Sequence, residues 1–189
     1  MENRKEKLRQ LILAILNKIG KSNKTKLAKL ILFSEIEYFK KYEASFTGLY
    51  FVRLPNGPVI AFFDEVLSEG EGLCWEKKTD LISIFSELEK KKQFTYSPIK
   101  EAIVEGGMDE IVSSVVSTYG SLTATALSER SHELPAWRHS EPNEPIYTAE
   151  LSIENEAEYF ALIDLLDEID DAEEEDNLPL QKALSPTLS

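Results

Sequence analysis

Apolar residues recur every three to four positions through the first 42 residues, which is the spacing of amphipathic helices. The first predicted helix covers residues 5–19 and has an outer side rich in Lys and Arg. The second covers residues 24–42 and is apolar around most of its girth, so we expect it at the centre of the core. Gly20 separates the two helices, as glycine commonly does just past a helix end.

A change of pattern after residue 46 predicts β-structure. Residues 47–54 are rich in β-forming side chains and lead into the turn cluster Pro55-Asn56-Gly57-Pro58. This combination predicts a short strand or the arm of a hairpin. A short helix is expected next, over Ile60–Leu67, ending at the loop Gly70-Glu71-Gly72.

Residues 73–97 have no single clear period, and two alternatives remain open. The first is a pair of edge strands, Leu81–Phe85 and Gln93–Tyr96, around the charged turn Glu87–Lys92. The second is a helix followed by a strand.

The helical period returns in the last third of the chain. It predicts a helix from Glu110 to Tyr119 and another over Ala124–Ser131, capped by Thr123 or Ser121. A last helix, Glu154–Asp170, is expected to bury one apolar stripe: Tyr159, Leu162, Ile163, Leu166 and Ile169. The acidic run and the Pro- and Ser-containing end over residues 171–189 predict a disordered tail.

These elements predict an α+β fold that is mainly α-helical, a helical bundle around a central apolar helix with a small antiparallel β-sheet or hairpin. A chain of 189 residues with 42 % hydrophobic residues suits a single domain with a real core. We expect that domain to span residues 1–170. It would consist of the basic N-terminal helix 5–19, the core 24–150 and the acidic C-terminal helix 154–170.

Charge is distributed unevenly along the chain. The net charge is −13, yet residues 1–30 carry nine basic side chains against two acidic ones. Residues 150–189 carry thirteen acids against Lys182 alone. The net acidity disfavours a general nucleic-acid binder and favours a basic partner. The basic start is expected either to contact nucleic acid or to be neutralised by the acidic end.

Targeting signals are not evident. No stretch approaches the roughly 18 consecutive apolar residues of a membrane helix, and the apolar run Leu11–Leu16 is too short for a signal peptide. Cys74 is the only cysteine and forms no internal disulfide, which favours a reducing compartment. We therefore expect a cytoplasmic protein with no membrane contact.

Motifs for catalysis or metal binding fail on their spacing. Gly20-Lys21-Ser22 lacks the glycine that a phosphate-binding loop needs five positions earlier, where Ile15 stands. His132 and His139 lie seven residues apart, not the four of a zinc-protease helix, and Pro135 would break that helix.

Nucleophilic catalysis is not indicated either. Ser131, His132 and Glu133 are sequence neighbours, which do not face one another on a helix, and Cys74 has no nearby His. We therefore predict no enzyme, no catalytic residue, no metal and no cofactor. Instead, His132, Pro135 and Trp137 are expected to form a local cap that anchors a loop against the core.

Two stretches of the chain resemble a known family. The first runs from Lys26 to Glu35 (Lys-Leu-Ala-Lys-Leu-Ile-Leu-Phe-Ser-Glu), with Tyr38, Thr47-Gly48 and then Leu54-Pro55-Asn56-Gly57-Pro58-Val59. The second holds Tyr119-Gly120-Ser121-Leu122-Thr123-Ala124, then Leu127-Ser128, then Ser131-His132-Glu133-Leu134-Pro135-Ala136-Trp137. In this order and spacing, over about residues 5–150, they resemble the Panacea domain of the SocA-like antitoxins, a family also described as phage-associated proteins.

The resemblance implies a non-enzymatic antitoxin that neutralises a toxin protein by direct protein–protein binding. It implies a cognate toxin encoded next to it and, in one mode, delivery of that toxin to a protease of the ClpXP type. The candidate partner-binding residues are the exposed members of the motifs: Tyr38, Asn56, Gly57, Pro58, His132 and Trp137. The alternatives are a DNA-binding autoregulator that uses the basic first helix, a phage-associated interaction protein without toxin neutralisation, and an enzyme with a cryptic site around His132.

Overall fold

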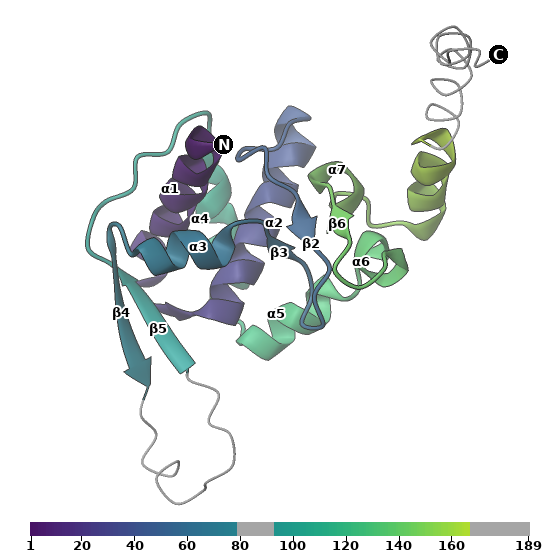
Figure 1. The fold of residues 1–189 in the computed structure, drawn as a ribbon. Coiled ribbons are helices and arrows are strands. Elements are labelled where there is room, and N and C mark those ends of the chain that lie inside the picture. Colours follow the sequence, from purple (N-terminus) through teal and green to yellow (C-terminus); the bar gives the residue numbers. More distant parts are fainter. Residues whose placement is uncertain (79–92, 167–189) are drawn as a thin grey trace, which may run out of the picture.

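Two long helices form the centre of the fold in a computed structural model that describes residues 1–78 and 93–166 (Figure 1). They are α1 (Glu2–Ile19) and α2 (Lys24–Tyr42). Every residue of α2 from Leu27 to Ile36 is buried, as expected for a helix that is apolar on nearly every side. The Asn23 side chain accepts a hydrogen bond from the Lys26 amide at 2.9 Å and so caps the start of α2.

Shorter helices pack around this centre. They are α3 (Phe63–Glu69), α4 (Met108–Tyr119), α5 (Ala124–Ser131), α6 (Pro135–His139) and α7 (Thr148–Leu151). Both α4 and α5 pack directly on α2, and α4 also packs on α1. The Thr123 hydroxyl accepts from the Ala126 amide at 3.1 Å, which confirms the predicted cap and start of α5.

Two small antiparallel sheets complete the fold. In the first, β2 (Phe51–Val52) lies between β3 (Val59–Ile60) and β6 (Pro145–Ile146), with Phe51 opposite both Ile60 and Ile146. In the second, β5 (Gln93–Pro98) lies between β1 (Ser22–Asn23) and β4 (Leu73–Lys78). The predicted fold class, α+β and mainly helical with small antiparallel sheets, is confirmed.

Two predicted elements differ in the structure. Val59–Ile60 is a strand, not the start of a helix, because these residues pair with β2 and the Ile60 side chain is buried in the core. The helix begins only at Phe63, after Phe62 adopts a left-handed backbone with φ of 62°. Between residues 73 and 97, the strand that begins at Gln93 agrees with the prediction, whereas β4 was not predicted. The segment Leu81–Phe85 lies outside the described residues.

The C-terminal helix, described over residues 156–166, contacts the rest of the molecule mainly through its first turns and then projects away (Figure 1). Asn155 caps it by accepting from the Ala157 amide at 2.8 Å. Tyr159 is only 5 % exposed, but Leu166 is 43 % exposed, so the predicted burial of Leu166 is wrong. The helix extends beyond the surface on which its apolar stripe begins, and Ile169 and the tail lie outside the described residues.

None of the described helices is long and apolar enough to cross a membrane.

Candidate functional site

The turn between β2 and β3 brings the chain into close contact with α2 and α5. The Gly57 amide donates to the Leu54 carbonyl at 2.9 Å and closes the turn. Gly57 has a φ of +92°, a region that favours glycine. A Cβ added there would lie 2.1 Å from the Ser131 hydroxyl oxygen and 2.7 Å from the Lys29 nitrogen. Glycine is therefore required both by the backbone angle and by the close approach.

Lys29 lies beneath this turn and is 1 % exposed. Its Nζ donates to the Pro58 carbonyl at 2.8 Å, and this bond ties the middle of α2 to the turn. Burial lowers the pKa of the Lys29 amine to about 7, because the charged form loses its hydration inside the protein. Part of the Lys29 side chain also borders a hollow of about 270 Å³, whose walls include Asn56 and Phe63.

His132 and Trp137 form the other side of the same cluster. Their rings stack with centroids 3.9 Å apart and planes 10° apart. Trp137 Nε1 donates to the Leu54 carbonyl at 3.0 Å, and the Arg53 guanidinium lies 4.9 Å from the centre of the indole ring. Arg53 Nε donates in turn to the Trp137 carbonyl at 2.9 Å. These contacts hold the segment after α5 against the β2–β3 turn.

His132 carries an unusual nitrogen. Its Nε2 is buried and has no hydrogen-bond partner within residues 1–78 and 93–166. Burial lowers the pKa of His132, the charge of Lys29 lowers it further, and the backbone of Asn56 acts in the opposite direction. The environment thus favours the neutral imidazole, which suits its flat stacking on Trp137 inside the cluster.

The structure brings together five of the six residues singled out from the sequence: Asn56, Gly57, Pro58, His132 and Trp137. Tyr38 lies elsewhere, half-buried, with its ring 4.6 Å from that of Tyr42 and 5.3 Å from that of Phe46. Gly57 and Pro58 are buried and Trp137 is half-buried, while Asn56 is exposed at the tip of the turn. Most of the cluster is therefore engaged in contacts within the chain.

A second buried charge, Glu35, was not predicted from the sequence. Its carboxylate accepts from the Ser45 hydroxyl at 2.9 Å and from the amides of Phe46 and Thr47 at 3.0 Å each. Burial raises the pKa of Glu35, and the hydrogen bonds from this loop act in the opposite direction. Glu35 and Lys29 share one helix and each fixes a different loop. Both lie within the motif Lys26–Glu35, and a charged residue inside an otherwise apolar run is the signal that could have revealed them.

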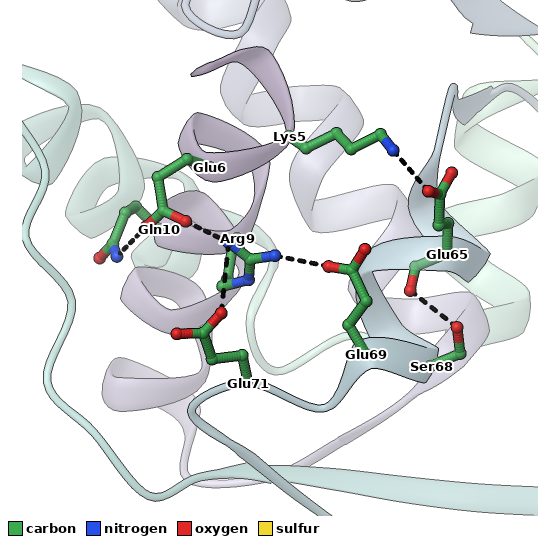
Figure 2. A network of polar contacts seen from close by, with 8 residues as sticks. All are labelled: Lys5, Glu6, Arg9, Gln10, Glu65, Ser68, Glu69 and Glu71. Carbon is green, nitrogen blue, oxygen red and sulfur yellow. Dashed lines mark hydrogen bonds and ion pairs between the residues drawn. The ribbon is translucent and has the colours of Figure 1, made fainter. Parts of the chain in front are cut away.

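The basic N-terminal helix is largely neutralised by acids from other parts of the chain, as Figure 2 shows for its first half. Arg9 is 6 % exposed, binds Glu6 on its own helix and reaches Glu69 of α3 at 2.5 Å. Lys5 pairs with Glu65 of α3, and Lys18 pairs with Asp109 of α4 at 2.8 Å. Within the described residues the neutralising acids come from α1 itself, α3 and α4, whereas the sequence suggested the acidic C-terminal end.

The geometry favours a scaffold role for the cluster. The Lys29 amine is bonded to a carbonyl, and the Trp137 indole is bonded to another, so both act as ties between separate segments. Within residues 1–78 and 93–166, no three His, Cys, Asp or Glu side chains gather in a way that could hold a metal ion.

Comparison with known proteins agrees with the motifs. Residues 27–138 match the family described as "Antitoxin SocA-like, Panacea domain". The match begins in α2, ends just past Trp137 and contains the whole Lys29–Gly57–Trp137 cluster. No curated protein and no solved structure matches the chain. Because the matched segment is more than half of the 189 residues, the chain belongs to the family of SocA-like antitoxins with a Panacea domain.

Proposed function

We propose that this protein is an antitoxin that neutralises a cognate toxin protein by binding it directly, without catalysis, in the cytoplasm. The observation that carries the proposal is the family match over residues 27–138, whose members are described as SocA-like antitoxins. A toxin encoded beside the antitoxin is the expected partner.

The geometry adds support for a binding role. The motif residues Lys29, Gly57 and Trp137 are occupied by contacts that assemble the domain. Large apolar side chains are exposed away from this cluster, among them Leu165 at 52 % and the aromatic residue Phe160 at 46 %. Exposed aromatic residues are common anchors of protein interfaces. A rigid domain that displays such residues suits recognition of another protein.

The DNA-binding alternative has less support. Binding to DNA depends on basic side chains that are free to neutralise phosphates. Arg9, Lys5 and Lys18 instead pair with acids of α1, α3 and α4 (Figure 2). The chain as a whole has a net charge of −13, which opposes approach to a phosphate backbone.

Co-expression tests the proposed function. The reading frame next to the gene is placed under tight induction in cells with and without this protein, and surviving cells are counted. We expect the neighbouring product to be toxic alone and harmless with the antitoxin. A matched control carries a stop codon in place of Lys5, so that rescue by the RNA is distinguished from rescue by the protein. A harmless neighbour, or rescue that survives the stop codon, would contradict the proposal.

The fate of the toxin distinguishes two ways of neutralising it. Masking leaves the amount of toxin in rescued cells unchanged and yields a complex that co-purifies. Delivery to a protease of the ClpXP type shortens the lifetime of the toxin, and this shortening disappears in cells that lack the protease. Both outcomes require direct binding, so the co-purification is measured in the protease-deficient cells as well.

A further inference from the structure

The C-terminal helix and the loop before it enclose a cleft on the surface. This hollow of about 270 Å³ lies between α6, β6 and residues 156–166. Its apolar walls include Tyr159, Phe160 and Ile163, and its acidic walls include Glu144 and Glu150. We refer to it by these five residues as the C-terminal cleft.

The apolar wall of the cleft belongs to a stripe that is only partly covered. Residues spaced by three and four lie on one side of a helix, so Tyr159, Ile163 and Leu166 form a continuous row. Along this row the side chains change from buried (Tyr159) through half-buried (Ile163) to exposed (Leu166). Phe160 flanks the row and is 46 % exposed. The described residues leave the outer part of the stripe open to a partner.

The first turn of the helix is firmly held, so the cleft has a defined shape. His139 Nε2 lies 2.9 Å from a Glu156 carboxylate oxygen, and Arg138 reaches the same oxygen at 3.1 Å. The His139 ring also packs against Tyr159 and Phe160, with centroids 5.9 Å and 4.8 Å apart. These contacts fix the orientation of both aromatic rings before any partner arrives, which reduces the entropy lost on binding.

The surroundings of the cleft carry an excess of acidic side chains. Between residues 141 and 166 the chain has no Lys, Arg or His, and it has seven acids: Glu141, Glu144, Glu150, Glu154, Glu156, Glu158 and Asp164. Glu154 pairs with Lys40, and Glu156 pairs with Arg138 and His139. No basic side chain among the described residues pairs with Glu144 or Glu150. Burial raises the pKa of Glu150, and the nearby charge of Glu144 raises it further.

We propose that the C-terminal cleft is the docking site for a basic segment of the toxin, with a lysine or arginine side chain lying between the two aromatic rings and the carboxylates of Glu144 and Glu150. The methylene stem of such a side chain packs on Ile163 and Phe160, while its cationic end meets the carboxylates and the aromatic faces. This inference rests on the proposed antitoxin function and names the surface that performs it.

Two further observations favour this occupant. A second copy of this chain would bring another acidic surface to the cleft, and like charges at an interface oppose association. The cleft is also built largely from residues beyond position 138, where the family match ends. The Panacea scaffold is shared within the family, so a surface outside the match is well placed to recognise the partner of this chain in particular.

The test measures affinity for the toxin, the neighbouring gene product that the wild-type protein neutralises. Two variants alter the cleft: Phe160→Ala, and a double variant with Glu144→Gln and Glu150→Gln. The glutamine side chains of the double variant keep oxygens that can accept hydrogen bonds from the Glu141 and Tyr147 amides. Two matched controls alter another exposed surface, Trp75→Ala and Glu76→Gln. Thermal unfolding of each variant first verifies that the domain remains folded.

We expect Phe160→Ala to weaken the Kd by at least about 30-fold, as for an aromatic anchor at an interface. The double glutamine variant should bind more weakly and lose most of the salt dependence of the association rate. The controls should stay within about threefold of the wild type. Wild-type affinity in both cleft variants, or loss of binding in Trp75→Ala alone, would overturn the inference while leaving the antitoxin function standing. A wild-type protein that neither binds nor neutralises the neighbour would refute the proposed function itself.

Discussion

Replacing Gly57 by alanine tests the contact that joins the β2–β3 turn to α2 and α5. Gly57 has a φ of +92°, and the new Cβ would lie 2.1 Å from the Ser131 hydroxyl oxygen and 2.7 Å from Lys29 Nζ. The backbone angle costs an L-residue about 1–2 kcal/mol, and forced shifts in a packed site cost about 1–3 kcal/mol. We therefore expect Gly57→Ala to lower the free energy of unfolding by about 2–5 kcal/mol. In a domain of this size that corresponds to a fall in Tm of roughly 5–15 °C.

A matched variant separates the two costs. Gly70 also has a positive φ, +67°, but the nearest atom to an added Cβ is the Ser68 carbonyl oxygen at 3.9 Å. Gly70→Ala should therefore lose only about 1–2 kcal/mol, from the backbone angle alone. Urea denaturation followed by circular dichroism gives both values. Adding Ser131→Ala to Gly57→Ala removes the closest oxygen and should restore part of the stability. If Gly57→Ala loses no more than Gly70→Ala, the close packing of the turn is refuted.

Four further predictions concern single contacts and the tail. Between pH 7 and 10.5 the unfolded wild-type chain binds a proton that the buried Lys29 amine, with its pKa of about 7, has released, so the stability of the wild type rises with pH. Lys29→Met lacks this gain, and its free energy of unfolding should fall further below that of the wild type as the pH rises. A pH-independent difference in urea denaturation would argue against this. Trp137→Ala should cost about 2–4 kcal/mol through its lost stacking and its bond to Leu54, and an unchanged Tm would mark Trp137 as an exposed contact instead. Glu35→Gln should cost about 1–3 kcal/mol and speed hydrogen exchange of the Phe46 and Thr47 amides; unaltered exchange would count against its role in holding the loop. Removal of residues 171–189 should leave unfolding cooperative, since the sequence of this tail offers few apolar anchors, and a broad, non-cooperative transition would disprove it.

The helices of the core could be predicted closely because periodicity and capping act locally. Thr123 marks the start of α5 through a hydrogen bond to a residue three positions away, which sequence alone reveals. The apolar girth of α2 likewise predicts its burial at the centre. Local signals failed where pairing with distant segments decides the structure. Val59–Ile60 is a strand because β2 lies beside it, and Leu166 is exposed because the surface beneath the C-terminal helix ends.

The candidate cluster was found in part. Its glycine turn and its His132–Trp137 pair were recognisable as motifs, but their contact across about 80 positions is a property of the fold. A charged residue within an apolar run marks Lys29 as unusual, but this signal does not show that Lys29 ties α2 to the turn, because its partner lies 29 positions away. Its partner, the Pro58 carbonyl, is a backbone group that every sequence possesses. The function of such a lysine becomes visible only when its surroundings are known.

The most direct test of the central claim is an isothermal titration calorimetry experiment, in which the purified protein is titrated with the purified neighbouring gene product. We predict saturable binding with a defined stoichiometry, tight enough for the complex to survive size-exclusion chromatography. Cells co-expressing the two proteins should then survive to the extent that the complex forms. Rescue of growth without any measurable complex between the purified proteins would contradict an antitoxin that acts by direct binding.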